Sequence, residues 1–290
     1  MSAPSTSVRE HSVPLTGTPR SIDVRNAAGS VTVRAAEEAT ELVVRFSART
    51  SAAEEVLDRI DLLVTGSALR IAVPERRLTR TPEVSVEVVT PPGAAVSVRT
   101  ASGDVDLRGR LAEVEVTTAS GDVAVEHAGR LTARTANGAV RLTAVDGPAT
   151  VGTASADVRL ERAGGPVEVR TASGDVTVAE AAGDVRATTA SGDVTVGRAR
   201  AGTVQLKTVS GDVTVVIEPR LRVWMDVQSI SGRLTSDLAD DLAGDGRGAD
   251  GPADVSVLLQ SVTGDLRLRR AVPRPPQPPV PPVPPAPAHL

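Results

Sequence analysis

One six-residue phrase, Thr-Ala-Ser-Gly-Asp-Val, or a close variant of it, recurs along this chain at nearly constant spacing. The centres of the first seven copies lie 18, 17, 18, 18, 18 and 19 residues apart, and two further copies follow after 21 and 32 residues. A fixed period of this kind is typical of repeat proteins, in which each unit packs on its neighbours. The nine centres are Gly103, Gly121, Gly138, Ala156, Gly174, Gly192, Gly211, Gly232 and Gly264.

Each repeat reads as two short strands separated by turns. In Val96–Thr100 and in Val105–Leu107, apolar residues alternate with polar ones, which is the pattern of strands with one buried face. Such short strands cannot bury an apolar face alone, so each coil must pair with the coils on either side. We therefore predict an all-β fold, a single-stranded parallel β-helix (β-solenoid) with about 18 residues per coil. The crossover rule for parallel strands predicts right-handed winding.

Departures from the period divide the chain into regions. We predict a disordered segment over 1–18, decorated N-terminal coils over 19–95, regular solenoid over 96–270 and a disordered Pro-rich tail over 271–290. The stretch 237–254 is rich in Asp and Gly, which predicts an exposed acidic loop inserted into the solenoid.

The N-terminal region carries the phrase once, followed by a different pattern. Ser51 and Glu54 form a capping box ahead of an apolar stripe, which predicts a short helix near 51–60 that covers an end or flank of the first coils. Equal intervals of 37 residues, which predict two coils each, separate Gly29, Gly66 and Gly103.

The turns carry the repeated Gly and Asp residues. Gly103 fits a turn that needs a positive φ, and the neighbouring Ser and Asp can hydrogen-bond the local backbone. Stacking would place the Asp side chains in a column about 4.8 Å apart, interrupted by Ala139 and ended by Arg233. Carboxylates at this spacing repel by only about 1 kcal/mol in water, so backbone hydrogen bonds explain the column without a cation. The turn residues predicted to be structural are Gly103, Asp104, Gly121, Asp122, Gly174, Asp175, Gly192, Asp193, Gly211 and Asp212.

Composition excludes several kinds of chemistry. The chain has no cysteine, which rules out disulfides, thiolate catalysis and Cys-ligated metals. His11, His127 and His289 form no predicted metal cluster or nucleophile–base pair. A net charge of −4 gives no basic footprint for nucleic acid. We predict no catalytic residue, cofactor or metal, and a protein that is not an enzyme.

The C-terminal coils differ from the rest. In Leu221–Val227 the apolar residues alternate inward, which points Trp224 outward with Arg222 and Asp226. Either the acidic insertion that follows covers Trp224, or these residues are a contact for a partner. The Ala that follows the repeated Thr is replaced by Val209, Ile230 and Val262, which predicts a larger cross-section at this end. The Pro-rich tail is either a ligand for an aromatic groove or an inert extension.

The iterated Ser-Gly-Asp-Val coils, together with the stretch Ile22–Val33, resemble the bacterial DUF4097 family, also called the toastrack or "putative adhesin" family. The resemblance spans roughly residues 20–270. It implies a parallel β-solenoid of unassigned molecular function, often associated with the cell envelope and its stress responses, and it supplies no catalytic residues. We find no signal peptide and no transmembrane segment, so we expect a cytoplasmic protein with peripheral association with the envelope as an alternative.

These observations favour a non-enzymatic scaffold or adhesin-like interaction module that binds an unidentified protein. Self-association is the competing mode, as in bactofilin-like structural proteins that join end to end. A glycan-active β-helix enzyme is a third hypothesis, which the near absence of aromatic residues disfavours.

Overall fold

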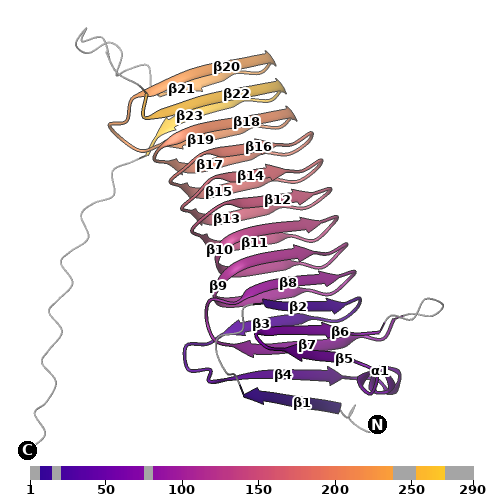
Figure 1. Cartoon of the computed structure of the whole chain (residues 1–290). Coiled ribbons are helices and arrows are strands. Elements are labelled where there is room, and N and C mark those ends of the chain that lie inside the picture. Colours follow the sequence, from indigo (N-terminus) through magenta and orange to yellow (C-terminus); the bar gives the residue numbers. More distant parts are fainter. Residues whose placement is uncertain (1–6, 15–20, 75–80, 238–252, 272–290) are drawn as a thin grey trace, which may run out of the picture.

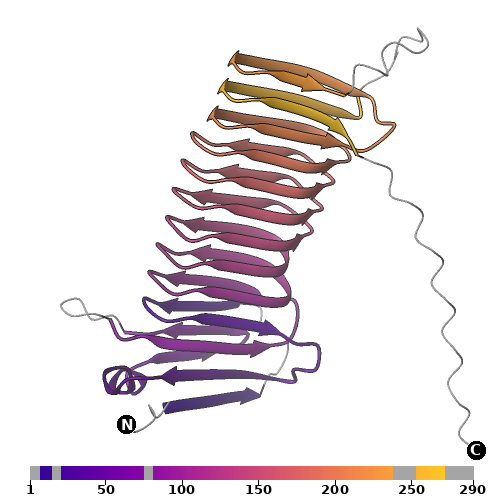
Figure 2. The same cartoon turned by 180° about the vertical axis from the view of Figure 1, so that it is seen from behind.

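The chain forms an elongated rod of stacked coils, as Figures 1 and 2 show from opposite sides. The computed structural model describes residues 7–14, 21–74, 81–237 and 253–271. Nearly every described coil contributes one strand to each of two faces, and all strands join into one 23-stranded sheet because β9 and β10 run across both faces. The predicted β-solenoid is confirmed.

The first face lies on one side of the rod, and its strands follow one another by direct pairing. From the N-terminal end these are β1 (Ser7–Pro14), β4 (Glu41–Ala48), β7 (Val84–Thr90), β3 (Val31–Ala35), the first parts of β9 (Val105–Thr117) and β10 (Val123–Thr135), β11 (Val140–Val145), β13 (Val158–Ala163), β15 (Val176–Ala181), β17 (Val194–Ala199), β19 (Val213–Ile217), β23 (Leu266–Arg270) and β21 (Leu234–Ser236).

The second face is built in the same way. Its strands are β5 (Asp61–Thr65), β6 (Ala68–Ala72), β2 (Ser21–Asn26), β8 (Ala95–Thr100), the second parts of β9 and β10, β12 (Ala149–Thr153), β14 (Val167–Arg170), β16 (Val185–Thr188), β18 (Gly202–Ser210), β22 (Val255–Thr263) and β20 (Val223–Ser231).

The interior is a narrow layer of aliphatic side chains in register from coil to coil. Val158, Val176, Val194 and Val213 pair in sequence along one face, and each is at most 1% exposed. Because like residues stack on like residues, each added coil extends the same apolar column, and alternation turns the polar residues between them outward.

The coils do not stack in chain order at either end. At the C-terminal end, β22 and β23 lie between the β18–β19 coil and the β20–β21 coil, so the last coil of the chain is second from the end of the rod. At the N-terminal end, β2 and β3 lie between the β6–β7 coil and the β8–β9 coil. The sequence-order stacking implied by the repeat is wrong there. The exchange gives each chain-terminal coil a hydrogen-bonded neighbour on both sides.

The long insertion at the N-terminal end accounts for a second correction. A Cβ on Gly103 would lie 1.9 Å from the carbonyl oxygen of Gly29, so these two turns belong to adjacent coils rather than to coils four apart. Gly66 is not a solenoid turn, because it joins the antiparallel strands β5 and β6. The described strands β4 to β7, which lie between these two turns in the chain, therefore stack beyond the β2–β3 coil at the end of the rod.

The cover consists of antiparallel strands and one short helix. On the first face β4 pairs with β7 and β1 pairs with β4, and on the second face β5 pairs with β6, all antiparallel. The helix α1 (Ser51–Leu57) lies beside β4 and begins after an N-cap at Thr50, whose side chain accepts a hydrogen bond from Ala53 N–H. The cap predicted at Ser51 is thus one residue too late.

Residues 7–14 also correct the predicted disorder over 1–18. They form β1, which ion pairs hold to its neighbours: Arg9 contacts Asp58, and Arg45 donates to Glu10 at 2.8 Å.

Within the described part of the chain, no helix combines the length and the apolar character that crossing a membrane requires. The predicted Pro-rich tail and most of the acidic loop lie outside the described residues.

Candidate functional site

The outermost coil at the C-terminal end, formed by β20 and β21 and here called the end coil, exposes residues that are buried elsewhere in the rod. Met225 and Leu234 stack in register on Val257 and Leu266, which are at most 1% exposed, yet Met225 is 40% and Leu234 51% exposed. No described strand lies beyond them, so positions that belong to the core in every inner coil face solvent here.

Trp224 points out of the solenoid, as predicted. It pairs with Ser256 of β22, and its side chain is 52% exposed. Arg222, unlike Trp224, is held by a neighbouring coil. Its backbone N–H and its guanidinium donate to the carboxylate of Asp254 at 2.9 Å and 3.2 Å. These hydrogen bonds lower the pKa of Asp254 and raise the pKa of Arg222. Arg222 therefore ties the end coil to β22, while the role of Trp224, Arg222 and Asp226 as partner contacts stays a prediction.

Three branched side chains form a line beside this end, here called the apolar ridge. Val209, Val262 and Ile230 are stacked by the register of β18, β22 and β20, and they are 51%, 38% and 83% exposed. The larger cross-section predicted from these residues is wrong, because Thr208 before Val209 is the buried residue and alternation turns Val209 outward. A hollow of about 530 Å³ runs along the ridge and is lined on its polar side by Lys207, Gln228 and Gln260.

The repeated turn Asp residues form hydrogen bonds between coils. Each carboxylate accepts the backbone N–H at the same position of the next coil, rather than the local backbone as predicted. Asp265 extends this column between Asp212 and Arg233, which reflects the exchanged order of the last coils. The bonds, of 2.8–3.1 Å, join Asp104 to Asp122, Asp122 to Ala139, Asp157 to Asp175, Asp175 to Asp193, Asp193 to Asp212, Asp212 to Asp265 and Asp265 to Arg233.

Close packing favours glycine in these turns, although Ala156 takes the equivalent position in one of them. Gly103 and Gly121 do not have a positive φ, contrary to prediction, although Gly174, Gly192 and Gly211 do. A Cβ on Gly121 would lie 1.9 Å from the carbonyl oxygen of Gly103 in the preceding coil, a distance that backbone atoms cannot accommodate. The turns thus set the stacking distance.

Among the described residues, no group of three or more His, Asp or Glu side chains is placed to hold a metal ion.

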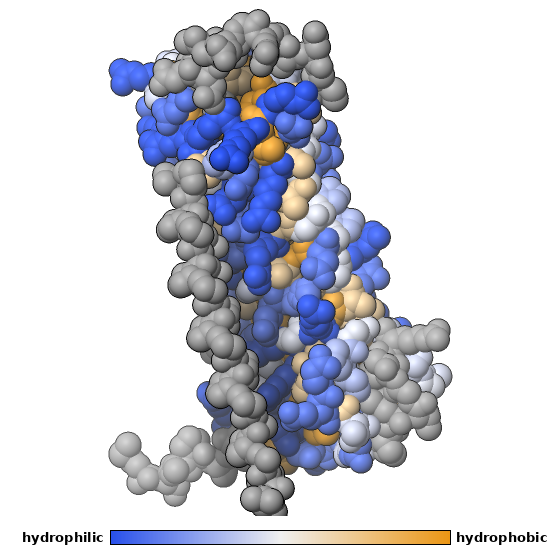
Figure 3. Space-filling view, turned by 90° about the vertical axis from the view of Figure 1, so that its left-hand side faces the viewer, coloured by the Kyte–Doolittle hydropathy of each residue, from blue (hydrophilic) through white to orange (hydrophobic). Residues whose placement is uncertain are grey.

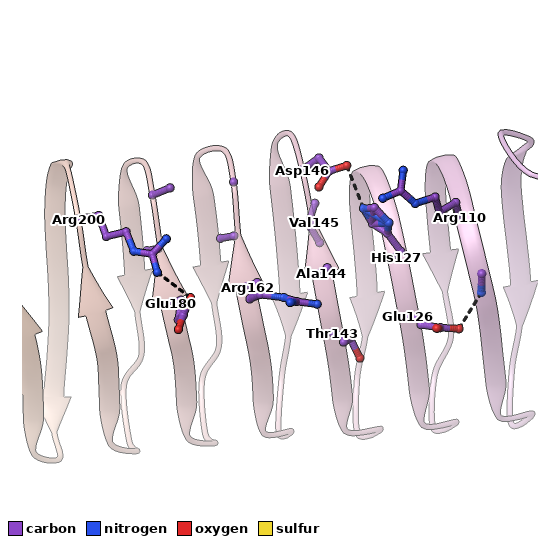
Figure 4. A pocket seen from close by; sticks show the side chains of 15 residues that line it. Arg110, Glu126, His127, Thr143, Ala144, Val145, Asp146, Arg162, Glu180 and Arg200 are labelled. Carbon is purple, nitrogen blue, oxygen red and sulfur yellow. Dashed lines mark hydrogen bonds and ion pairs between the residues drawn. The ribbon is translucent and has the colours of Figure 1, made fainter. Parts of the chain in front are cut away.

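A second hollow, of about 520 Å³, lies along the edge of the first face, where β9 and β10 cross to the second face and where β11, β13, β15 and β17 end (Figure 4). Arg162 extends along the surface toward the coil of Ala144, whose small side chain leaves the space open (Figure 4). Most of the other charged groups are engaged with one another or with backbone. Glu126 accepts from Gly109 N–H at 2.8 Å, His127 Nε2 lies 2.9 Å from Asp146 Oδ2, and Arg200 donates to Glu180 at 3.1 Å.

The comparisons with known proteins identify the family. A family model described as Toastrack DUF4097 matches residues 19–269. The chain belongs to the toastrack family. No curated protein matches it.

Solved structures similar to this toastrack chain come from several bacteria. A "putative lipid binding protein" from Parabacteroides distasonis is 12% identical, with 90% of this chain and 96% of that chain covered and a TM-score of 0.43. A "putative adhesin" from Bacteroides fragilis is 12% identical over 91% and 98%, with a TM-score of 0.34. A "putative cell adhesion protein" from Clostridium sporogenes is 10% identical over 92% and 100%, with a TM-score of 0.26.

The apolar character of the toastrack surface is concentrated at the C-terminal end. Of the nine large hydrophobic side chains exposed in the described residues, six lie in the last three coils; the other three, Val8, Leu63 and Val64, lie at the N-terminal end. Most of the side of the rod seen in Figure 3 is hydrophilic. The six are Val209, Trp224, Met225, Ile230, Leu234 and Val262. They make the C-terminal end the candidate site.

Proposed function

We propose that this chain is a non-enzymatic interaction module in which a rigid solenoid presents its C-terminal end to a protein partner. The observation that carries the proposal is the gathering of Trp224, Met225, Leu234 and the apolar ridge at one end of the rod. Large apolar side chains that are exposed together at one end of a folded protein favour an interaction site there, and Trp is among the residues that contribute most to binding when buried at an interface.

The charged hollow of Figure 4 supports the non-enzymatic part of the proposal. Its histidine and most of its acids lie in pairs with neighbours, and it lies along the edge of the first face. An acid–base pair in a glycosidase needs two carboxyl groups converging on one substrate from a shielded site. The cytoplasmic location, with peripheral envelope association as the alternative, stays a prediction.

The test compares the two ends of the rod. The variant Trp224→Ser with Ile230→Ser removes the two most exposed apolar residues of the end coil, and Leu63→Ser removes a comparably exposed residue (52%) of β5 at the other end. Each protein captures partners from an extract of the native host, and a captured protein is then purified and its affinity for each variant is measured by calorimetry. We expect binding that the first variant loses and the second retains. Equal binding by all three proteins contradicts the proposal.

A further inference from the structure

The edge of β20 presents unpaired backbone groups. The carbonyl of Arg222 accepts from Asp254 N–H and Val255 N–H, so Arg222 faces β22. Backbone groups alternate in direction along a strand, so those of Val223, Met225, Val227 and Ser229 point away from the rod. No described strand pairs with them, and an edge of this kind is a template for a further strand.

Other strands at the ends of the faces are better protected. β1 carries Arg9 and Glu10, both held in ion pairs across β4 and α1. β5 is five residues long, whereas β20 has nine residues with Asp226 as its single charge. Charges and short length are the features that keep edge strands from pairing, and β20 is long and carries only one charge.

We propose that the partner of this end is a second copy of the chain, joined by antiparallel pairing of β20 with β20 about a two-fold axis at Val227. The inference rests on the proposed function, since it names the occupant of the same surface. In this register Val227 faces itself and Met225 faces Ser229, and these residues exchange the free backbone hydrogen bonds.

The same register matches the outward side chains. Trp224, 52% exposed, faces Ile230, 83% exposed, on each side of the axis. Aromatic and β-branched residues form favourable cross-strand pairs. Asp226 faces the neutral Gln228. Moving the axis by one residue, to Asp226, would place two carboxylates opposite each other, which is destabilising.

Pairing about a two-fold axis closes the assembly at two copies. The interface uses the edge of β20 in both copies, and the remaining C-terminal edge strand, β21, is only three residues long. The N-terminal end is covered by antiparallel strands of different sequence. The inward-facing Met225 and Leu234 become internal because the two solenoid cores meet. The result is a rod of twice the length, not a filament.

Single cysteines test the register directly. The native chain has no cysteine, so Val227→Cys introduces one thiol at the axis. Directly paired residues in a hydrogen-bonded antiparallel site lie about 5.5 Å apart between Cα atoms, which suits a disulfide. We expect rapid formation of a covalent dimer by Val227→Cys under mild oxidation, and much slower formation by Met225→Cys, which faces Ser229, and by Leu63→Cys at the far end. Equal rates for the three proteins would overturn the register.

Sedimentation of the full chain tests the assembly itself. We expect a dimer at micromolar concentration, its loss in Val227→Lys, and its retention in Leu63→Lys, with circular dichroism confirming that both variants keep their strands. A monomeric wild-type protein, or filaments, would overturn the inference. A monomer that still binds a different protein through Trp224 and Ile230 would leave the proposed function standing and remove only the second copy.

Discussion

The two ends of this rod are built by the same exchange of coils and finished in different ways. At each end, the coil nearest the chain terminus does not lie outermost in the rod. The β2–β3 coil lies inside the β6–β7 coil, and the β22–β23 coil lies inside the β20–β21 coil. At the N-terminal end, antiparallel strands and α1 then cover the outermost coil. At the C-terminal end, core positions of the outermost coil face solvent.

The two large aromatic residues of the chain mark this difference. Phe46 lies in β4 at the covered end and is 2% exposed, and Trp224 lies in β20 at the open end and is 52% exposed. One completes a core and the other is available for contact. Repeat proteins are stabilised by interfaces between neighbouring units, so the covered end should be held firmly and the end coil only by its single neighbour.

The largest expected difference between the two ends is in the loss of stability when their aromatic residues are replaced by alanine. Phe46→Ala should lower the free energy of unfolding by about 3–5 kcal/mol, because it leaves a cavity in the cover. Trp224→Ala, compared in the Val227→Lys background that removes the dimer, should lower it far less, because half of this side chain is already exposed. Urea unfolding followed by circular dichroism measures both. Similar losses in the two variants would show that the end coil is as tightly packed as the cover.

An intermediate loss of stability is expected from replacing a turn glycine by alanine, and its size should differ between an inner coil and the end coil. A Cβ at Gly121 or at Gly232 would lie 1.9 or 2.0 Å from a carbonyl oxygen of the neighbouring coil. Gly121→Ala sits between two coils and should cost about 1–3 kcal/mol. Gly232→Ala can relax by displacing the end coil, so its main result should be faster amide hydrogen exchange in β20 and β21. Gly152→Ala, which meets no atom within 4 Å, is the control.

The smallest effect concerns the dependence of stability on pH. The hydrogen bond from Asp265 N–H, followed by that from Arg267, lowers the pKa of Asp212. A carboxyl group with a lowered pKa in the folded state stabilises the fold above its unfolded pKa, and this contribution disappears as the pH falls through the folded value. The urea midpoint should therefore fall as the pH drops below about 4. Asp212→Asn keeps an acceptor for Asp265 N–H and should reduce this acid loss. Asp254→Asn, which changes the carboxylate that binds Arg222 beside the end coil, should reduce it less.

Much of the architecture could be predicted because it is periodic. The strands and the outward direction of Trp224 follow from alternation within a few residues, and the 18-residue coil follows from the spacing of the repeated phrase. The apolar ridge could also have been predicted from alternation, because a side chain at Val209 must point outward when that of Thr208 points inward. The order of the coils at the ends could not be predicted. Every coil carries a similar turn, so each coil could stack on any other. The local sequence therefore does not determine which coils are neighbours in the rod.

The exchanged order at the C-terminal end has a consequence for synthesis. Residues 223–236 leave the ribosome before residues 255–270, at a time when the edge of β18 and β19 is free. In the finished rod that edge belongs to β22 and β23. The segment that emerges first must therefore leave the edge open or be displaced from it, so assembly of this solenoid cannot proceed coil by coil from the ribosome. Its final interface closes only after translation has passed the last repeat.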